Sequence, residues 1–206
     1  MPTETDVDAL VHERTRRATS VYERHAYLVY NLALRVTCSC QAADRATERT
    51  FLTRVTRPDP DADVGATAVR GAREEAPERP PAEDAGDPDE ARLLRATAAL
   101  PAAQRAALAL TGLCGVDERG VAATLDLGQD GAATLVEASR GALGARLGVT
   151  AQAADEAYAM WAWASPPEAL WQSLWPQLHE ALVQSSRSGG GTLRAQGGDS
   201  GAGGAK

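Results

Sequence analysis

The chain contains few residues of the types that most often catalyse reactions or bind metal ions, and their spacing suits neither role. Cys38, Cys40 and Cys114 fit neither an even disulfide framework nor a four-ligand zinc site, and Cys38 and Cys40 are too close for the usual two-residue metal spacing. We interpret them as small, reduced core residues. The sequence also lacks a glycine-rich phosphate loop and a nucleophile with a plausible base. We therefore expect no catalytic residue, no metal and no cofactor, and an enzyme is the least supported class.

Recognition of a polyanion is the other chemistry that the charged residues could supply. The 206 residues include 21 Lys and Arg against 28 Asp and Glu, a formal net charge of −7 at pH 7. Lys206 is the one lysine, so arginine side chains supply nearly all of the positive charge. Nucleic-acid binding draws much of its affinity from cations that displace counterions at phosphates. The acidic balance lowers the expectation of nucleic-acid binding but leaves room for a local basic patch.

The elements that must position these residues are predicted to be helices. Hydrophobic residues make up 44% of the chain and aromatic residues 4%, so Leu, Ala and Val must form most of the core. Alanine and leucine lose little side-chain entropy in a helix, and period-two runs of Val, Ile and Tyr are absent from the sequence. We therefore predict an all-α protein. The sequence contains no recognisable signal peptide and no apolar run long enough to cross a bilayer, so we expect a cytoplasmic protein with no membrane partner.

Five stretches of different composition divide the chain. We predict a helical domain at 1–56, an acidic, proline-rich linker at 57–90, a second helical domain at 91–148, a tryptophan-rich helical extension at 151–184 and a disordered Gly- and Ser-rich tail at 185–206. The linker is expected because its Pro, Asp and Glu residues cannot bury enough apolar surface to offset chain entropy. The predicted architecture is two small helical bundles on an acidic tether, followed by a C-terminal amphipathic helix.

The first domain carries an apolar stripe of helical period. Its members recur at three- and four-residue steps and are Val21, His25, Leu28, Leu32 and Val36, with Tyr22 and Val29 beside them. Residues 1–20 are expected to form a helix that frays at its start. A second helix is predicted over 42–54, after a corner at 38–41. Because this helical pair is too small to be stable alone, residues 1–20 or the later block must cover it.

The second domain has the pattern of a helix-turn-helix unit. Helices are predicted over 90–100 and 101–113, and Asp117 is placed to cap a third helix whose inward residues include Val121 and Leu125. A glycine-containing turn at 126–131 separates this helix from the last one. The inward face of that last helix consists of Ala132, Leu135, Val136, Ser139, Leu143 and Leu147. Two short helices joined by a tight turn indicate a helix-turn-helix, although plain helical bundles share the pattern.

Three segments resemble the extracytoplasmic-function (ECF) family of RNA polymerase sigma factors. Val21 to Val36 resembles the opening helix of region two in that family, and Ala43 to Leu52 resembles the next helix. Leu94 to Leu147 resembles region four, with a Leu-Pro-x-x-Gln-Arg-x-x-Leu string that begins at Leu100. The matches cover somewhat under half of the chain, and their order agrees with the family plan.

The resemblance implies a transcription initiation function with no catalytic residue of its own. Region two would bind core RNA polymerase, here through Asp44, Arg45 and Glu48, and would help to open the downstream promoter element. Region four would place its second helix, Gly131 to Leu147, in the major groove of the upstream promoter element. The polymerase and promoter DNA are the partners that this resemblance implies.

The chain departs from the family pattern where charge matters most. Only Asp44 remains of the acidic residues that usually begin the second helix of region two, and the stretch at 54–80 lacks the tryptophan or phenylalanine that could stack on a flipped base. Among the recognition-helix positions, base contact could come from Gln129, Thr134 or Arg140. The alternative is that the helix-turn-helix serves as a scaffold. The chain would then be a degenerate sigma-like regulatory or interaction protein that no longer reads promoter DNA.

The tryptophan-rich segment predicts an amphipathic helix. Its apolar face is a four-residue ladder of Leu170, Leu174, Leu178 and Leu182, with Trp171 and Trp175 beside it and a bend expected at Pro176. One interpretation is that the helix folds back on the region-four-like block and completes its core. The other is that the segment Trp161–Leu182 docks an anti-sigma factor or another protein partner, because tryptophans anchor interfaces well. His179 is a lone imidazole and is interpreted as structural.

Overall fold

The computed structural model describes residues 4–57, 59–78, 80, 88–161 and 163–189. The described residues are all helical or irregular and contain no strand, which confirms the all-α prediction. The helices are α1 (Glu4–Thr37), α2 (Cys40–Val55), α3 (Val64–Glu75), α4 (Pro88–Ala98), α5 (Ala102–Cys114), α6 (Glu118–Leu125), α7 (Gln129–Leu147), α8 (Ala151–Ala159) and α9 (Glu168–Gly189). Within this part of the chain, no helix is both long and apolar enough to span a membrane.

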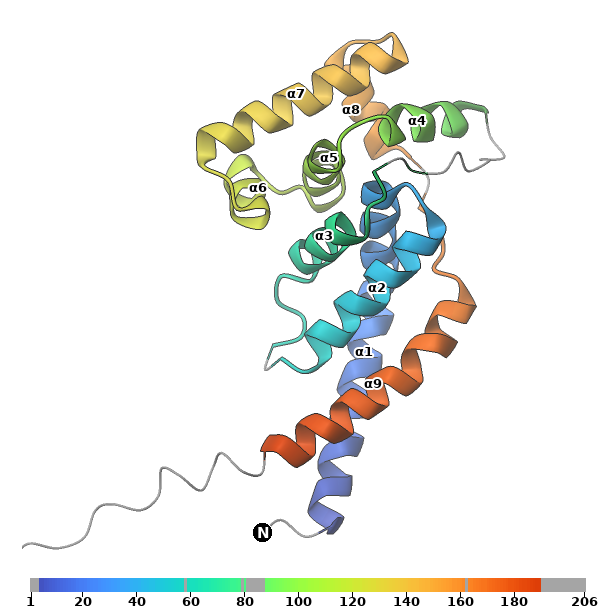
Figure 1. The fold of residues 1–206 in the computed structure, drawn as a ribbon, viewed down its shortest axis with the longest axis vertical. Helices are drawn as coiled ribbons and strands as arrows, with labels where there is room; N and C mark the ends of the chain where they lie inside the picture. Colours follow the sequence, from blue (N-terminus) through green and yellow to red (C-terminus); the bar gives the residue numbers. More distant parts are fainter. Residues whose placement is uncertain (1–3, 58, 79, 81–87, 162, 190–206) are drawn as a thin grey trace, which may run out of the picture.

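Helix α1 is the axis of the first block, with α2 and α3 packed against it and against each other (Figure 1). The predicted stripe is largely buried: Val21, Val29, Leu32 and Val36 are in the core, whereas His25 and Leu28 are half-buried. Helix α1 ends where Cys38 adopts a left-handed conformation, with φ of 51°. The next residue, Ser39, caps α2 by accepting a hydrogen bond from the Ala42 amide. Cys38 and Ser39 form the corner between α1 and α2, which the sequence predicts over the wider range 38–41.

The predicted linker at 57–90 contains a well-packed helix, so that prediction is wrong for residues 64–75. Helix α3 buries Val64, Ala68, Val69, Gly71 and Ala72 against α1 and α2. These side chains are small, and therefore the helix can approach α2 closely enough to bury a continuous stripe. The average composition of the segment hides this stripe among prolines and acids. Residues 81–87, the remainder of the acidic passage, lie outside the described residues.

The second block consists of α4 to α8. Pro101 immediately precedes α5, and Gly115 ends it in a left-handed conformation with φ of 60°. The predicted cap is confirmed, because the Asp117 carboxylate accepts a hydrogen bond of 2.9 Å from the Gly120 amide. Val121 and Leu125 are buried, as predicted. Helix α8 packs on α7 and α5 and buries Tyr158 beside Leu108 and Leu143.

The two blocks share a core and are not separate bundles on a tether. Helix α5 packs against both α1 and α3, so Ala106 and Leu110 lie in the same apolar cluster as Leu32 and Val69. Figure 1 shows α5 and α6 directly beside α3, with α4, α7 and α8 beyond them. The predicted helices are present, but they form one packed unit.

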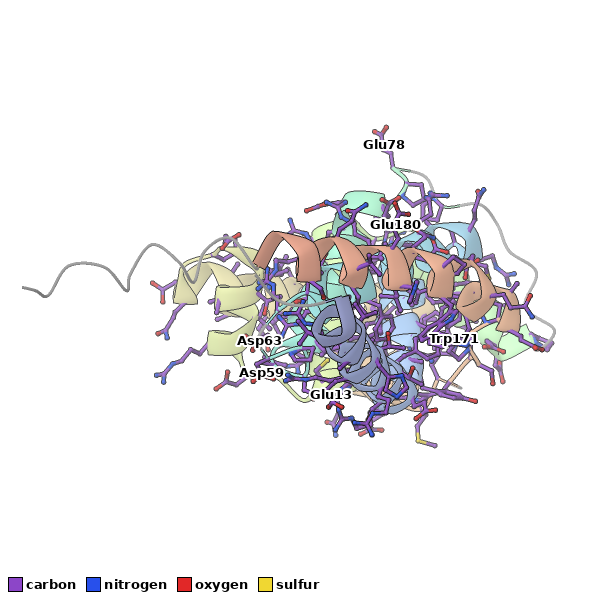
Figure 2. All side chains as sticks on the ribbon, turned by 90° about the horizontal axis from the view of Figure 1, so that it is seen from below. Glu13, Asp59, Asp63, Glu78, Trp171 and Glu180 are labelled. Atoms are coloured by element: carbon purple, nitrogen blue, oxygen red, sulfur yellow. The ribbon has the colours of Figure 1, made fainter. Side chains whose placement is uncertain are left out.

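Helix α9 covers the first block, which differs from the interpretation that it completes the region-four-like core. All four ladder leucines are buried, and α9 packs on α1 and α2. Figure 2 shows α9 beside α1, and Trp171 stacks on Tyr22 of α1 with ring centroids 4.2 Å apart. Trp161 instead completes the core of the second block. Helix α9 continues to Gly189, so the predicted tail at 185–206 begins as helix, and 190–206 lie outside the described residues.

A pair of buried threonines gives a test of this core. Thr47 of α2 is fully buried, and its hydroxyl has no hydrogen-bond partner within the described part of the chain. Thr37 is equally buried, but its hydroxyl donates to the Ala33 carbonyl at 2.8 Å. Because an unpaired buried hydroxyl costs free energy, Thr47→Val should raise the free energy of unfolding by about 0.5–1.5 kcal/mol. Thr37→Val should lower it by about 1 kcal/mol. Urea unfolding of both variants provides the measurement, and equal effects would contradict the packing described here.

Candidate nucleic-acid interface

Helices α6 and α7 follow one another with a short turn between them. Helix α6 ends at Leu125 and is capped by Asp126, whose φ is 56° and whose amide donates to the Ala122 carbonyl. Gly128 precedes α7, so only residues 126–128 separate the two helices. The turn is shorter than predicted because α7 begins at Gln129.

Helix α7 has a buried face and an exposed face. The predicted inward residues Ala132, Val136, Ser139, Leu143 and Leu147 are buried, and Leu135 is half-buried. The other side of α7 is exposed and carries the acids Asp130 and Glu137 and, near its end, the cation Arg146; its other exposed residues are Gln129, Gly131, Thr134, Ala138, Gly141 and Ala145. The outward face of the N-terminal half of α7 is therefore accessible to a macromolecule.

The three residues predicted to contact bases do not form one cluster. Gln129 and Arg140 line the same groove between α5, α6 and α7, whereas Thr134 does not line it. Thr134 is exposed, and its hydroxyl donates to the Asp130 carbonyl at 2.8 Å. Arg140 is held by two carboxylates: its Nε lies 3.3 Å from Oδ2 of Asp155, and its Nη1 lies 3.6 Å from Oε1 of Glu137. The guanidinium of Arg140 is thus partly neutralised within the chain.

The groove beside α7 has a volume of about 680 Å³ and mixed charge. The cations on its wall are Arg119 and Arg140, and the acids are Asp117 and Glu118. Carboxylates repel phosphate, so this groove favours a polar ligand with hydrogen-bonding groups over a dense polyanion. Within the described residues, no group of three or more His, Cys, Asp or Glu side chains could hold a metal ion.

The residues predicted to bind a polymerase lie on α2, and two of them contact neighbouring helices. Arg45 pairs with Glu75 of α3, with Nε and Oε2 2.9 Å apart. Glu48 accepts a hydrogen bond from the Ser173 hydroxyl of α9. Asp44 is half-buried, and this burial raises the pKa of its carboxyl, as does the nearby charge of Glu48, against a smaller opposing effect from Arg45. The structure places Arg45 and Glu48 in contacts with α3 and α9, respectively.

Two buried arginines join the blocks, and sequence reasoning did not identify either of them. Arg35 of α1 donates to the carbonyls of Tyr158 at 2.7 Å and Trp161 at 2.6 Å. Arg105 of α5 donates to the Val36 carbonyl and, at the end of α4, to the carbonyls of Ala98 and Leu100. Burial lowers the pKa of both guanidinium groups. One signal was present, because Arg35 lies one residue before Val36 of the apolar stripe and three after Leu32.

No family model, curated protein or solved structure matches this chain.

Proposed function

We propose that this chain is a sigma-factor-like transcription initiation protein that binds core RNA polymerase and recognises promoter DNA through α6 and α7. The observation that carries the proposal is the accessible outward face of α7, which directly follows the short turn after α6. An α-helix with its side chains is about 10–12 Å wide and the major groove of B-DNA is about 12 Å wide, so an exposed helix of this kind can enter it. The order of the ECF-like segments along the chain supports the same function.

A second function is favoured by the charges on α7. Asp130 and Glu137 lie on the outward face, and Arg140 is paired with Asp155. Each cation that is neutralised within the protein no longer releases a counterion from DNA. A sigma-like regulatory protein that retains the fold but not promoter reading would have these properties.

The apolar side of the C-terminal segment supports only part of the partner proposal. The ladder leucines of α9 are buried against α1 and α2, so they are not free to bind an anti-sigma factor while α9 stays in place. Trp163 is half-exposed and precedes α9. We propose that a protein partner of this segment binds around Trp163 and leaves the leucine ladder in place.

The ion pair between Arg140 and Asp155 predicts opposite effects of two substitutions. Arg140→Ala should weaken binding of the reconstituted holoenzyme to promoter DNA and reduce the slope of log affinity against log salt by about 1. Asp155→Asn should strengthen binding severalfold, because it removes the charge that holds Arg140. Promoter binding at several salt concentrations provides the measurement. Unchanged affinity and salt slope in both variants would contradict DNA reading by α7 and favour the regulatory protein.

The proposal as a whole is tested by run-off transcription with purified core polymerase and genomic DNA. New discrete transcripts that depend on the added chain are expected. A transcript pattern identical to that of core polymerase alone, together with an intact complex of the two proteins, would favour the regulatory alternative.

A further inference from the structure

A small pocket between the C-terminal half of α2 and helix α3 is lined mainly by arginine and threonine. Its volume is about 170 Å³, and its wall includes Arg49, Thr53, Arg57, Thr67 and Arg70. It is formed by different helices from the groove beside α7. Neither the sequence analysis nor the proposed function assigns it a role.

The positive charge at this pocket is only partly neutralised. Arg49 pairs with Glu74, which also lines the pocket, with Nη2 and Oε2 2.5 Å apart. Arg57 and Arg70 are exposed, and neither forms an ion pair with the described residues. In a chain with a net charge of −7, two arginines that line one pocket and have no carboxylate partner among the described residues are unexpected.

A third guanidinium group adds to the positive potential nearby. Arg54 is buried, and its side chain donates to the backbone carbonyls of Asp59 and Pro60, which carry no net charge. Burial lowers the pKa of Arg54, and the positive charges of Arg57 and Arg70 lower it further, against the opposing effect of Asp59 and Asp63. Asp59 and Asp63, labelled in Figure 2, belong to the loop before α3 and do not line the pocket. Arg57 and Arg70 are therefore each close enough to Arg54 to repel its charge.

The pocket also contains a hydrogen-bonding group without a partner. The hydroxyl oxygen of Thr67 is buried and forms no hydrogen bond within the described part of the chain. Unlike Thr50 and Thr134, whose hydroxyls donate to the carbonyl four residues back, Thr67 does not use the Asp63 carbonyl in this way. An anion in the pocket would give this hydroxyl an acceptor.

We propose that this pocket binds one phosphate group, held by the guanidinium groups of Arg57 and Arg70 and by the hydroxyl of Thr67. Guanidinium forks match phosphate oxygens in two-pronged, charge-assisted hydrogen bonds. The pocket is large enough to hold several waters, or one phosphate in their place. The site goes beyond the proposed function and does not depend on it. Free phosphate or a nucleotide and the backbone of a nucleic acid share this chemistry.

The test uses the full chain and inorganic phosphate, with binding measured by isothermal titration calorimetry at low ionic strength. Arg57→Gln and Arg70→Gln should each weaken phosphate binding by about tenfold, because each removes a charge-assisted contact. Glu74→Gln should strengthen it, because it removes the carboxylate from the wall. Arg73→Gln is the matched control, since Arg73 is exposed on the same helix but does not line the pocket.

Substitutions of Thr67 distinguish a specific hydrogen bond to phosphate from general electrostatic attraction by the arginines. Thr67→Val should weaken phosphate binding severalfold, and Thr67→Ser should retain it. The source of the phosphate is identified by competition with a single-stranded oligonucleotide that lacks terminal phosphates. Competition that depends on Arg57 and Arg70 indicates a nucleic-acid backbone, and its absence indicates a free phosphate or nucleotide. The proposal is overturned if phosphate does not bind, or if Arg73→Gln weakens binding as much as Arg70→Gln.

Discussion

Replacing Arg35 with alanine is expected to lower the free energy of unfolding by about 3–5 kcal/mol. The Arg35 side chain is 1% exposed and joins α1 to the end of α8. Its guanidinium donates two hydrogen bonds to backbone carbonyls, and its central carbon lies 5.0 Å from the ring centroid of Tyr158 and 4.9 Å from that of Trp161. Alanine would leave a cavity, would remove both hydrogen bonds and would end both cation–π contacts. Urea unfolding followed by circular dichroism provides the measurement.

A matched control separates this contact from a general effect of losing an arginine. Arg119 is exposed on α6, so Arg119→Ala should change the free energy of unfolding by less than about 0.5 kcal/mol. Arg35→Met retains the aliphatic stem and should lose less stability than Arg35→Ala. If Arg35→Ala and Arg119→Ala unfold at the same urea concentration, the contact between α1 and α8 does not stabilise the protein.

Replacing Leu174 with alanine should lower the free energy of unfolding by about 2–5 kcal/mol, and the first block should be the part that is destabilised. Leu174 of α9 is 0% exposed and lies in the same apolar cluster as residues of α1 and α2. Removing its side chain leaves a cavity beneath α9, so the helix should detach more often and expose its neighbours to solvent. Hydrogen exchange should therefore become faster in α9, α1 and α2 and change less in α4 and α7.

The exchange pattern distinguishes the observed packing from the interpretation based on sequence. If α9 completed the region-four-like core, Leu174→Ala would speed exchange in α4, α5 and α7 instead. Leu127→Ala is the control, because Leu127 lies in the turn before α7 and is 40% exposed. It should cost less than about 1 kcal/mol. Faster exchange confined to the second block would contradict the position of α9.

Features that depend on near neighbours in the sequence were predictable. The leucine ladder of α9, the Asp117 cap and the inward face of α7 follow from periodicity and capping, which act over three or four residues. Helix α3 was missed because its stripe is built from alanine and valine inside a segment whose average composition is that of a linker. A search for short stripes of small residues within 57–90 would have found it.

The contacts that determine the chemistry of the site depend on residues far apart in the chain. Glu48 accepts a hydrogen bond from Ser173, and Arg35 donates to backbone carbonyls at the end of α8. Arg140 also meets Asp155 of the next helix. Charge and periodicity identified these arginines and acids as polar residues but could not say which partner would neutralise each of them. The sequence therefore predicted where the candidate DNA-contacting helix lies, and the structure was needed to show that Arg140, one of its two cations, is already paired.

The proposed function requires that this chain bind core RNA polymerase, and a titration of the fluorescently labelled full chain with purified core polymerase tests this. Saturable binding is predicted. Asp44→Asn, which removes a charge without changing size, should weaken it severalfold, whereas Asp130→Asn on the outward face of α7 should leave it unchanged. Absence of saturable binding by the folded wild-type chain would contradict the sigma-like function.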